Sequence, residues 1–278
     1  MKIKIAWYGK HFGEEPPLCG DKNPASSAGK HGAGGIFFSG CNLRCVFCQN
    51  IQISQQGMGK EYSVDELAKI MLDLQNNGAV NIDLVTPTIW HKQIKTAIVK
   101  AKEMGLVIPI VWNSNGFETK EILRQMNGLV DIYVPDFKYG DDILAEKYSG
   151  VKNYVATAEG ALKEMLWQVG KFKTDKNGLG ERGVVVRHLV LPNNVENSFK
   201  VLEKLEEIDN NIHISLMRQY YPLHDAKKYP ELMREVSDEE WNLVYERMLD
   251  LGFANGWAQD KDSTAIMIPD FTKEKPFE

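Results

Sequence analysis

The sequence predicts an α/β fold in the form of a partial (βα)6 barrel, similar to an incomplete TIM barrel. Between residues 36 and 217, short apolar segments of strand-like composition alternate with segments of helical periodicity. The connections between them are short, which is typical of parallel strands joined by helices. Six strands are too few to close an eight-stranded barrel, and polar residues follow nearly every strand at the end where such barrels carry their sites.

The barrel is expected to begin with a strand at residues 36–38, after a lead-in at residues 9–35 that is rich in glycine, proline, serine and charge and is expected to be irregular. Ser63 and Glu66 form a capping box for a first helix at residues 64–76, whose apolar residues recur on one face. The remaining strands are expected at residues 81–85, 107–112, 130–134, 184–191 and 212–217. The helices between them are expected at residues 89–104, 120–126, 155–170 and 196–206.

A last helix is expected after the barrel. Ser237 and Glu240 form a second capping box, and Trp241, Val244 and Met248 then recur at helical spacing. A length of 278 residues suits one domain, so we interpret the whole chain as a single unit. Its parts are a lead-in at 1–35, a barrel core at 36–222 and a C-terminal extension at 223–278.

Composition narrows the class of protein. The formal net charge of −5 provides no positive field to gather nucleic acid, which is therefore not an expected partner. The first residues lack the apolar core of a secretory signal, and no run of about 18 apolar residues occurs, so we expect a cytoplasmic protein without a membrane partner. Three of the four cysteines lie within eight residues, which indicates metal or redox chemistry rather than a disulfide framework.

The segment GCNLRCVFCQN carries the main chemical signal. It places Cys41, Cys45 and Cys48 at C-x3-C-x2-C spacing on the loop between the first expected strand and the first expected helix. A four-iron cluster needs one ligand for each iron, so three cysteines leave one iron open to a non-protein ligand such as an amine with a carboxylate. The spacing therefore indicates a [4Fe–4S] cluster with an open iron.

A zinc site is the alternative use of clustered cysteines. Structural zinc has four ligands, usually as two separated pairs, and the sequence has no second C-x-x-C or H-x3-H pair. Cys19 is the remaining candidate for a fourth ligand. The six histidines are scattered without metal-binding spacing, so no separate histidine metal site is predicted.

The cysteine spacing, with Phe47 just before the third cysteine and the motif at the first βα loop, resembles the radical SAM superfamily. The stretches HFGEEPP, IFFSGCNLRCVFCQN, DIYVPDFKY, RHLVLPNN and GFANGW resemble the group similar to pyruvate formate-lyase activating enzyme. This resemblance implies a [4Fe–4S] cluster held by the three cysteines and S-adenosylmethionine (SAM) as cofactors. It also implies reductive cleavage of SAM to a 5′-deoxyadenosyl radical, which takes a hydrogen atom from a substrate held in the barrel. No further catalytic residue is assigned.

The resemblance also implies contacts to SAM after the second and third strands. Members usually carry a Gly-Gly-Glu-like turn after the second strand, where this chain has Val-Thr-Pro-Thr at residues 85–88. The hydroxyls of Thr86 and Thr88 are candidates to accept hydrogen bonds from the SAM ammonium in place of the missing carboxylate. Asn113, Ser114 and Asn115 are similar to an Asp-Thr-Asn stretch whose polar side chains face the SAM pocket, with Asn113 in place of the acid.

Further SAM contacts are implied after the later strands. Asp136 and Lys138 match an Asp-x-Lys motif in which the lysine approaches the methionyl carboxylate. Because they are alternate residues at one strand end, both side chains are expected on the same face. Arg187 matches an arginine of the family's fifth strand, and Gln219 with Tyr220 lies where activating enzymes place another SAM contact.

The substrate is left open by the sequence. One hypothesis is activation of a glycyl radical enzyme by hydrogen abstraction from a glycine of a partner protein, and the other is modification of a small molecule or peptide. A non-catalytic electron carrier or structural metal protein is the third alternative. A pocket closed by residues 9–35 and 220–278 favours a small substrate, whereas an open groove favours a protein loop. Glu14 and Glu15 read either as a substrate-facing loop or as a charged turn, and a reductant such as flavodoxin or ferredoxin is an expected partner.

Overall fold

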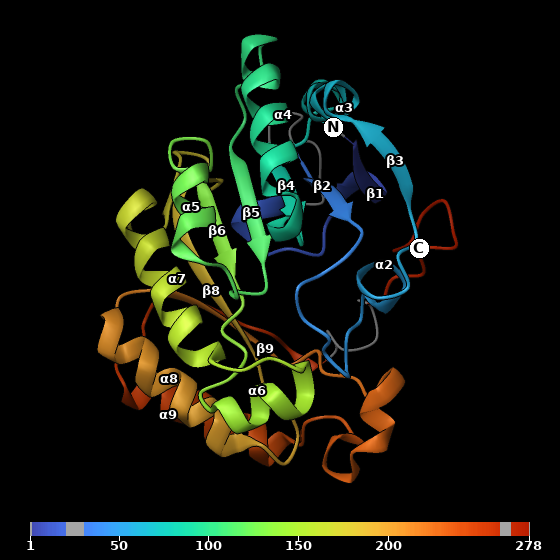
Figure 1. Cartoon of the computed structure of the whole chain (residues 1–278). Coiled ribbons are helices and arrows are strands. Elements are labelled where there is room, and N and C mark those ends of the chain that lie inside the picture. The colour runs from blue at the N-terminus through green and yellow to red at the C-terminus, as the bar shows by residue number, and fades with distance from the viewer. Residues whose placement is uncertain (1, 21–30, 262–267, 278) are drawn as a thin grey trace.

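The computed structural model describes residues 2–20, 31–261 and 268–277. Its centre is a sheet with the strand order β10-β9-β8-β6-β5-β4-β2-β1-β3 (Figure 1). The six expected strands are all present, and each pairs in parallel with the next expected strand along the chain. They are β2 (Ala33–Phe38), β4 (Ile82–Val85), β5 (Ile110–Ser114), β6 (Ile132–Pro135), β8 (Gly180–Leu189) and β9 (His213–Met217). The fold is therefore the partial α/β barrel that the sequence predicts.

The parallel strands are buried on both faces, which explains their almost continuous apolar sequences. Every residue of β2, β4 and β6 is buried. The register aligns their carboxyl ends, because Phe37 pairs with Val85, Val85 with Asn113, and Asn113 with Val134. The residues that follow these strands are thereby brought to a single edge of the sheet.

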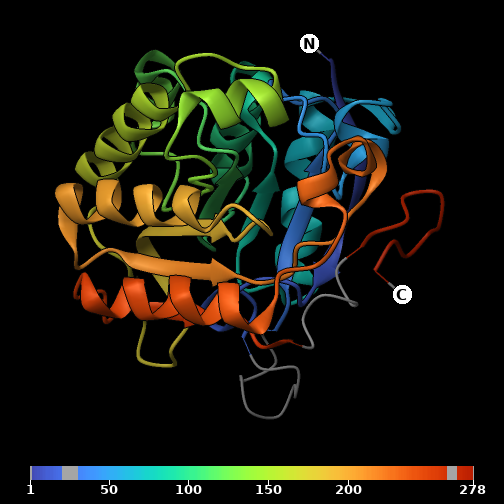
Figure 2. The same cartoon turned by 90° about the horizontal axis from the view of Figure 1, so that it is seen from below.

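Helices cover the outer face of the barrel (Figures 1 and 2). Both predicted capping boxes are confirmed, at Ser63 with Glu66 and at Ser237 with Glu240. The helix expected at 89–104 is divided into the 3-10 turn η1 (Thr88–Trp90) and α4. The long helices are α3 (Val64–Asn76), α4 (His91–Glu103), α7 (Tyr154–Val169), α8 (Val195–Asp209) and α9 (Asp238–Asp250), and the shorter ones are α2 (Ile51–Ser54), α5 (Lys120–Met126) and α6 (Asp142–Ser149).

The start of the chain differs from the expectation. β1 (Lys2–His11) pairs antiparallel with β2 and with β3 (Lys60–Ser63), and α1 (Pro16–Cys19) follows. The expectation of irregular structure is therefore wrong for residues 9–11, 16–19 and 33–35, while residues 21–30 lie outside the described residues. The alternation of exposed Lys2 with buried Ile3, and the buried Ile5 two residues later, is the period of a half-buried strand. The high glycine and proline content of the next twenty residues obscured this signal.

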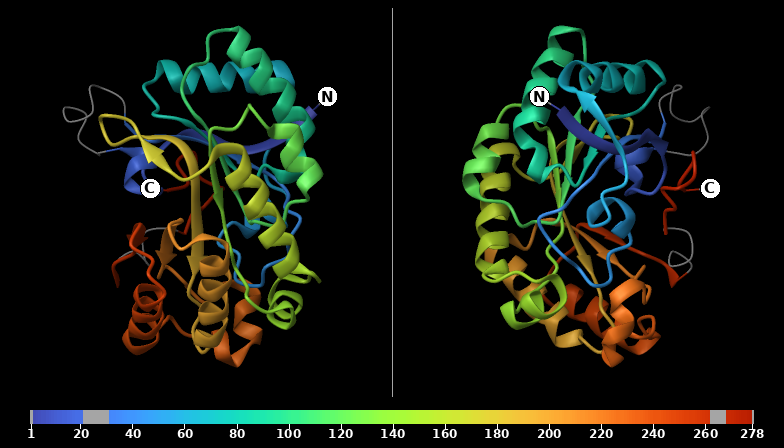
Figure 3. Two further views of the ribbon diagram at one scale, coloured as in Figure 1. Left: turned by 90° about the vertical axis from the view of Figure 1, so that its left-hand side faces the viewer. Right: turned by 45° about the vertical axis from the view of Figure 1, so that its right-hand side comes forward.

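The remaining elements extend the barrel at its other end. β10 (Gly256–Ala258) lies parallel to β9, and β7 (Lys173–Thr174) forms a short antiparallel pair with β8. The 3-10 turns η2 (His224–Lys228) and η3 (Pro230–Leu232) precede α9. Residues 268–277 return to the first strand (Figure 3). There the indole nitrogen of Trp7 donates to the carbonyl oxygen of Glu274 at 3.1 Å. None of the helices in the described part of the chain is long and apolar enough to cross a membrane.

The inner face of the sheet is covered by α1. Leu18 of this helix packs against Val111, Val134 and Val185, which alternate with outward-facing residues on β5, β6 and β8. The same alternation turns Asp83, Asn113 and Arg187 toward the barrel interior. α1 therefore brings the acidic residues that precede it to the inner ends of these strands.

Candidate functional site

A cavity of about 470 Å³ lies at the carboxyl ends of the parallel strands. All three cysteines of the motif line it, and Cys19 does not. The strand ends contribute Thr86, Asn113, Ser114, Asn115, Asp136, Lys138, Arg187 and Gln219. Two segments outside the barrel complete the wall, with His11, Glu14, Glu15 and Pro16 from the lead-in and Trp257, Gln259, Asp260, Pro269 and Phe277 from the C-terminal extension.

The cysteine loop is held in place by backbone hydrogen bonds. The amides of Arg44 and Val46 donate to the carbonyl oxygens of Ser149 and Tyr148, at the end of α6. Gly40, which precedes the first cysteine, has a φ of 91°, a conformation that residues with a side chain rarely adopt. The loop therefore enters the cavity from a fixed turn and is supported by a neighbouring helix.

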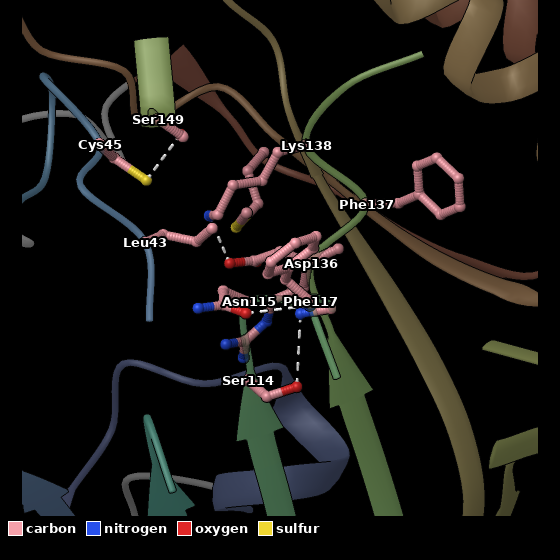
Figure 4. Close-up of polar contacts among 12 residues, drawn as sticks. Leu43, Cys45, Ser114, Asn115, Phe117, Asp136, Phe137, Lys138 and Ser149 are labelled. Atoms are coloured by element: carbon pink, nitrogen blue, oxygen red, sulfur yellow. Dashed lines mark hydrogen bonds and ion pairs between the residues drawn. The ribbon is translucent and has the colours of Figure 1, made fainter. Parts of the chain in front are cut away.

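The three sulfurs each have a donor beside them. Ser149 Oγ donates to Cys45 Sγ at 3.0 Å (Figure 4). Asn115 Nδ2 donates to Cys41 Sγ at 3.3 Å. Cys48 Sγ lies 3.2 Å from Ser54 Oγ. Hydrogen bonds of this kind stabilise thiolates and tune the potential of a bound cluster.

The thiols themselves resist deprotonation in the protein alone. Burial raises the pKa of Cys45 to about 12, and burial also raises the pKa of Cys48. The neighbouring thiols of the same loop raise both values further. The thiolate forms of Cys45 and Cys48 are therefore favoured by a cation beside them, which is the condition that metal binding meets. The donor set fits an iron–sulfur cluster.

Asp136 and Lys138 follow β6 and form an ion pair, with Lys138 Nζ 2.5 Å from Asp136 Oδ2 (Figure 4). This confirms that the two side chains share a face. Burial lowers the pKa of Lys138, but the charges of Asp136 and Cys45 outweigh burial, so the pKa is raised. The lysine is therefore a permanent cation close to the sulfur of Cys45.

The loop after β5 is hydrogen-bonded to the cysteine loop through Asn115. Asn115 Nδ2 also donates to Asn42 Oδ1 at 2.7 Å, and Asn115 Oδ1 accepts from the amide of Phe117 at 2.9 Å. A side chain at Gly116 would place its first carbon 2.1 Å from the carbonyl oxygen of Asp136, so only glycine allows the two strand ends to approach this closely. Ser114 Oγ accepts from the Gly116 amide at 3.4 Å.

The two threonines after β4 have different positions. Thr86 lines the cavity, and its φ of 59° is an outlier for a β-branched residue. Its amide donates to the carbonyl oxygen of Asn113 at 2.9 Å, which holds the turn against the next strand. Thr88 is buried outside the cavity, and its hydroxyl donates to Glu118 Oε1 at 2.6 Å. Only Thr86 is therefore available to a molecule in the cavity.

Arg187 is bound by carboxylates of the lead-in. Its Nε donates to Glu15 Oε1 at 2.8 Å and its Nη2 to Glu15 Oε2 at 2.5 Å, while the same Nη2 pairs with Glu14 Oε2. Its Nη1 donates to Asn113 Oδ1 at 3.2 Å. Glu14 and Glu15 are thus buried cavity residues rather than a solvated turn, and the arginine is occupied by protein groups at the floor of the cavity.

Of the last predicted pair of SAM contacts, Gln219 and Tyr220, only Gln219 faces the cavity. Gln219 lines the cavity, and its Oε1 accepts from Gln259 Nε2 at 3.0 Å. Tyr220 is only 1% exposed, donates its hydroxyl to the carbonyl oxygen of Leu232 at 2.8 Å and packs against Phe47. Consecutive residues in extended chain point to opposite sides, so only one of the two can face the cavity.

Cys19 lies in α1, apart from the cysteine loop. Its sulfur donates to the carbonyl oxygens of Glu14 at 3.4 Å and Glu15 at 3.6 Å. The cavity residues that sequence reasoning missed include His11, Gln259 and Phe277. They come from segments whose position depends on the completed fold. His11 lies in the stretch HFGEEPP, but nothing in that stretch marks it as a cavity residue.

A family model described as the radical SAM superfamily matches residues 36–205, a segment that contains the cysteine loop and the strands from β2 to β8. The chain belongs to the radical SAM superfamily. The superfamily uses a [4Fe–4S] cluster and SAM, so these are the cofactors of this chain. Cys41, Cys45 and Cys48, whose sulfurs line one cavity, are the residues of this chain that fit the cluster as ligands.

Relatives of this radical SAM enzyme differ in how much of their length it covers. An uncharacterised protein of Methanocaldococcus jannaschii is 32% identical over 252 residues, covering 86% of this chain and 66% of that protein. The pyruvate formate-lyase-activating enzyme of Clostridium pasteurianum is 25% identical over 205 residues, covering 71% of this chain and 78% of that enzyme. The chain thus spans just under two thirds of the archaeal relative's length.

Among solved structures, SuiB of Streptococcus suis bound to its precursor peptide SuiA is similar in fold. The TM-score is 0.55 at 13% sequence identity, over 80% of this chain and 47% of SuiB. SuiB has also been solved with SAM bound, with a TM-score of 0.51 at 12% identity over 83% of this chain and 48% of SuiB. This likeness is one of fold, shared with radical SAM partial barrels.

Proposed function

We propose that this radical SAM enzyme acts on a small molecule, or on one side chain of a peptide, held inside the cavity. When bound, the cluster and SAM supply reductive cleavage of SAM to methionine and a 5′-deoxyadenosyl radical. The residues of the chain bind, orient and exclude water. Cys41, Cys45 and Cys48 are the proposed cluster ligands.

The polar strand ends are the proposed SAM contacts. Thr86, Asn113, Ser114, Asn115 and Gln219 present hydroxyl and amide groups to the cavity. Lys138, kept charged by Asp136, is suited to a carboxylate such as that of the methionyl group. Thr88 and Tyr220, whose polar atoms are bonded within the protein, are left out of this proposal.

One observation carries the choice of substrate. The cavity that holds the three cysteines is also lined by His11 and residues 13–16 of the lead-in and by Trp257–Asp260, Pro269 and Phe277 of the C-terminal extension. A cavity of about 470 Å³ lined by the lead-in and the C-terminal extension suits an enclosed ligand better than a folded protein surface.

Deuterium transfer tests the proposal. The anaerobically reconstituted and chemically reduced enzyme would be incubated with SAM and with fractions from cells grown in deuterated medium. We expect a fraction of small molecules and peptides to accelerate formation of 5′-deoxyadenosine and to transfer deuterium into it, as mass spectrometry would detect. Transfer from the protein fraction alone would contradict the proposal.

Activation of a glycyl radical enzyme is the second candidate. The similarity to the pyruvate formate-lyase-activating enzyme of Clostridium pasteurianum favours it. It predicts a glycine-centred radical in a partner protein after reaction, detectable by electron paramagnetic resonance (EPR). For either substrate we propose an external one-electron reductant such as flavodoxin or ferredoxin, tested by replacing the chemical reductant in the same assay.

A further inference from the structure

A second group of metal-binding side chains lies at the floor of the cavity, apart from the cysteines. His11 is the last residue of β1, Glu14 belongs to the lead-in, and Asp83 is on β4. One ligand atom from each lies within 4.8 Å of the other two. The side chains are almost completely buried, with exposed fractions of 5% for His11, 9% for Glu14 and 2% for Asp83.

The histidine nitrogen points into this group without a hydrogen bond. His11 Nε2 lies 3.5 Å from Glu14 Oε1 and 3.6 Å from Asp83 Oδ2, and has no hydrogen-bond partner among the described residues. A buried polar atom left in this way is costly. A cation bound at about 2.1 Å with tetrahedral geometry separates its ligand atoms by about 3.4 Å, close to both of these distances.

The charges of the floor are not balanced within the protein. Glu14, Glu15 and Asp83 are three buried carboxylates, and Arg187 is the cation that pairs with the first two. With a neutral His11 this leaves two negative charges in excess. Burial lowers the pKa of His11, but Asp83 and Glu14 outweigh burial and raise it, so this group favours a positive charge, either as a proton on the imidazole or as a bound cation. Buried charge that is not neutralised is strongly unfavourable.

The ligand groups are oriented by their neighbours. Asn113 Nδ2 lies 3.4 Å from Glu14 Oε2 and 3.4 Å from Asp83 Oδ2, and Arg187 holds Glu14 Oε2, so that Glu14 Oε1 faces the histidine. The imidazole is stacked on Phe277, with ring centroids 5.6 Å apart. Support of this kind fixes the direction of metal ligands.

We propose that His11, Glu14 and Asp83 bind one divalent first-row transition metal ion, separate from the iron–sulfur cluster. One imidazole and two carboxylates suit Mn²⁺, Fe²⁺ or Zn²⁺. The ion neutralises the excess of two negative charges and occupies the nitrogen that has no partner. Binding of a metal through Nε2 requires the ring proton on Nδ1, which lies 3.4 Å from the Gly13 amide, so this long contact opens on binding.

A Mn²⁺ titration tests the site in the full chain with its cluster reconstituted. Mn²⁺ prefers oxygen and nitrogen ligands over thiolates, and the EPR signal of free Mn²⁺ disappears on binding. We expect about one equivalent bound per chain. Pulsed EPR of the bound ion is expected to detect coupling to a histidine nitrogen, a readout that needs no variant. A Zn²⁺ titration of the Cys41→Ala, Cys45→Ala and Cys48→Ala triple variant, which has no competing thiol loop, is expected to give the same stoichiometry.

Matched variants complete the test. We expect His11→Ala and Asp83→Asn to weaken binding at least about tenfold, while Glu15→Gln, which changes a neighbouring buried carboxylate outside the ligand set, retains the ion. Failure of both metals to bind, equal binding in all variants, or bound Mn²⁺ without nitrogen coupling would each overturn the proposal. None of these readouts involves SAM cleavage, so failure of this site and failure of the proposed function are distinguishable.

Discussion

The two ends of the cavity satisfy their polar groups in opposite ways. At the cysteine end, each sulfur lies beside a hydrogen-bond donor, and Asp136 is paired with Lys138. At the floor, carboxylates outnumber the guanidinium of Arg187, and a buried histidine nitrogen has no hydrogen-bond partner in the described part of the chain. The cysteine end therefore suits a metal bound through sulfur, whereas the floor has more carboxylates than cationic side chains.

The difference also concerns how each end is encoded. The cysteine end depends on one eight-residue motif with support from strand ends and α6. The floor combines residues from β1, the lead-in, β4 and β8, which are widely separated in the sequence. A short motif can be recognised before the fold is known, whereas a site assembled from four segments exists only in the folded chain.

The largest expected effect is at the cysteine end. Cys45→Ala is expected to abolish cluster-dependent formation of 5′-deoxyadenosine, because a four-iron cluster needs all three cysteine ligands in addition to SAM. Cys19→Ala is the matched control, since Cys19 is a buried thiol outside the cavity. Iron analysis and 5′-deoxyadenosine measurement check the prediction. Loss of the cluster in the Cys19→Ala variant would contradict the assignment of three ligands.

The same substitution at the two ends compares their electrostatics. Arg187→Met leaves Glu14 and Glu15 buried without their cation, and we expect a loss of about 3–5 kcal/mol in the free energy of unfolding. Lys138→Met removes the partner of the partly exposed Asp136, and we expect about 1–2 kcal/mol. Anaerobic thermal unfolding of cluster-loaded protein measures both.

A background variant checks the cause of the larger loss. In Glu14→Gln/Glu15→Gln protein, Arg187→Met no longer strands buried carboxylates, so its additional cost should be smaller. An equal cost in both backgrounds would show that the arginine contributes through packing rather than through charge.

A second buried histidine provides the contrast to His11. His188 Nδ1 lies 2.7 Å from the carbonyl oxygen of Phe137, and Nε2 lies 2.9 Å from Ser198 Oγ, so both nitrogens are satisfied. Burial lowers the pKa of His188 to about 4. The unfolded chain, with a histidine pKa of about 6.5, therefore binds more protons than the folded protein between these values, and stability falls as the pH falls through this window.

The expected loss from His188 is about 2 kcal/mol between pH 7 and pH 5, since one pKa unit corresponds to about 1.4 kcal/mol. Unfolding at the two pH values measures it, with His188→Gln as the comparison that removes this titration. If the variant shows the same dependence on pH as the wild type, other groups are responsible.

The smallest expected effect is at the hydrogen bond to one sulfur. Ser149→Ala removes the donor to Cys45 Sγ and the partner of the Tyr139 hydroxyl, which lies 2.6 Å from Ser149 Oγ. We expect a loss of about 1–2 kcal/mol in stability and a more negative cluster potential, because the thiolate loses a donor. EPR-monitored redox titration measures the potential, with Ser54→Ala at Cys48 as the matched comparison. An unchanged potential in both variants would show that these two serines do not affect the reduction potential of the cluster.

Most of the barrel was predictable from local patterns. Capping boxes and helical periodicity located α3 and α9, and apolar runs located the parallel strands. The alternation of side chains along extended chain predicted the shared face of Asp136 and Lys138 and, applied to Gln219 and Tyr220, would have excluded one of them.

The floor was not predictable in the same way. Contacts of His11 and Glu14 with Asp83 join residues about seventy positions apart, and only the strand order of the sheet brings them together. One signal was available: Asp83 is a carboxylate within the otherwise apolar strand IDLV, and a buried strand carries such a residue only where it has a partner. The wall from residues 269–277 had no signal, because its position depends on aromatic contacts with β1.

These aromatic contacts also bear on the order of events during protein synthesis. Phe277 packs against Trp7 and His11, with ring centroids 5.2 and 5.6 Å apart, and so closes a wall that the first strand begins. The ribosome produces the cysteine loop long before it produces this residue, and folding begins with the part made first. The three thiols are therefore present in the growing chain before Phe277 can complete this wall, so this side of their cavity stays open until residue 277 has been made.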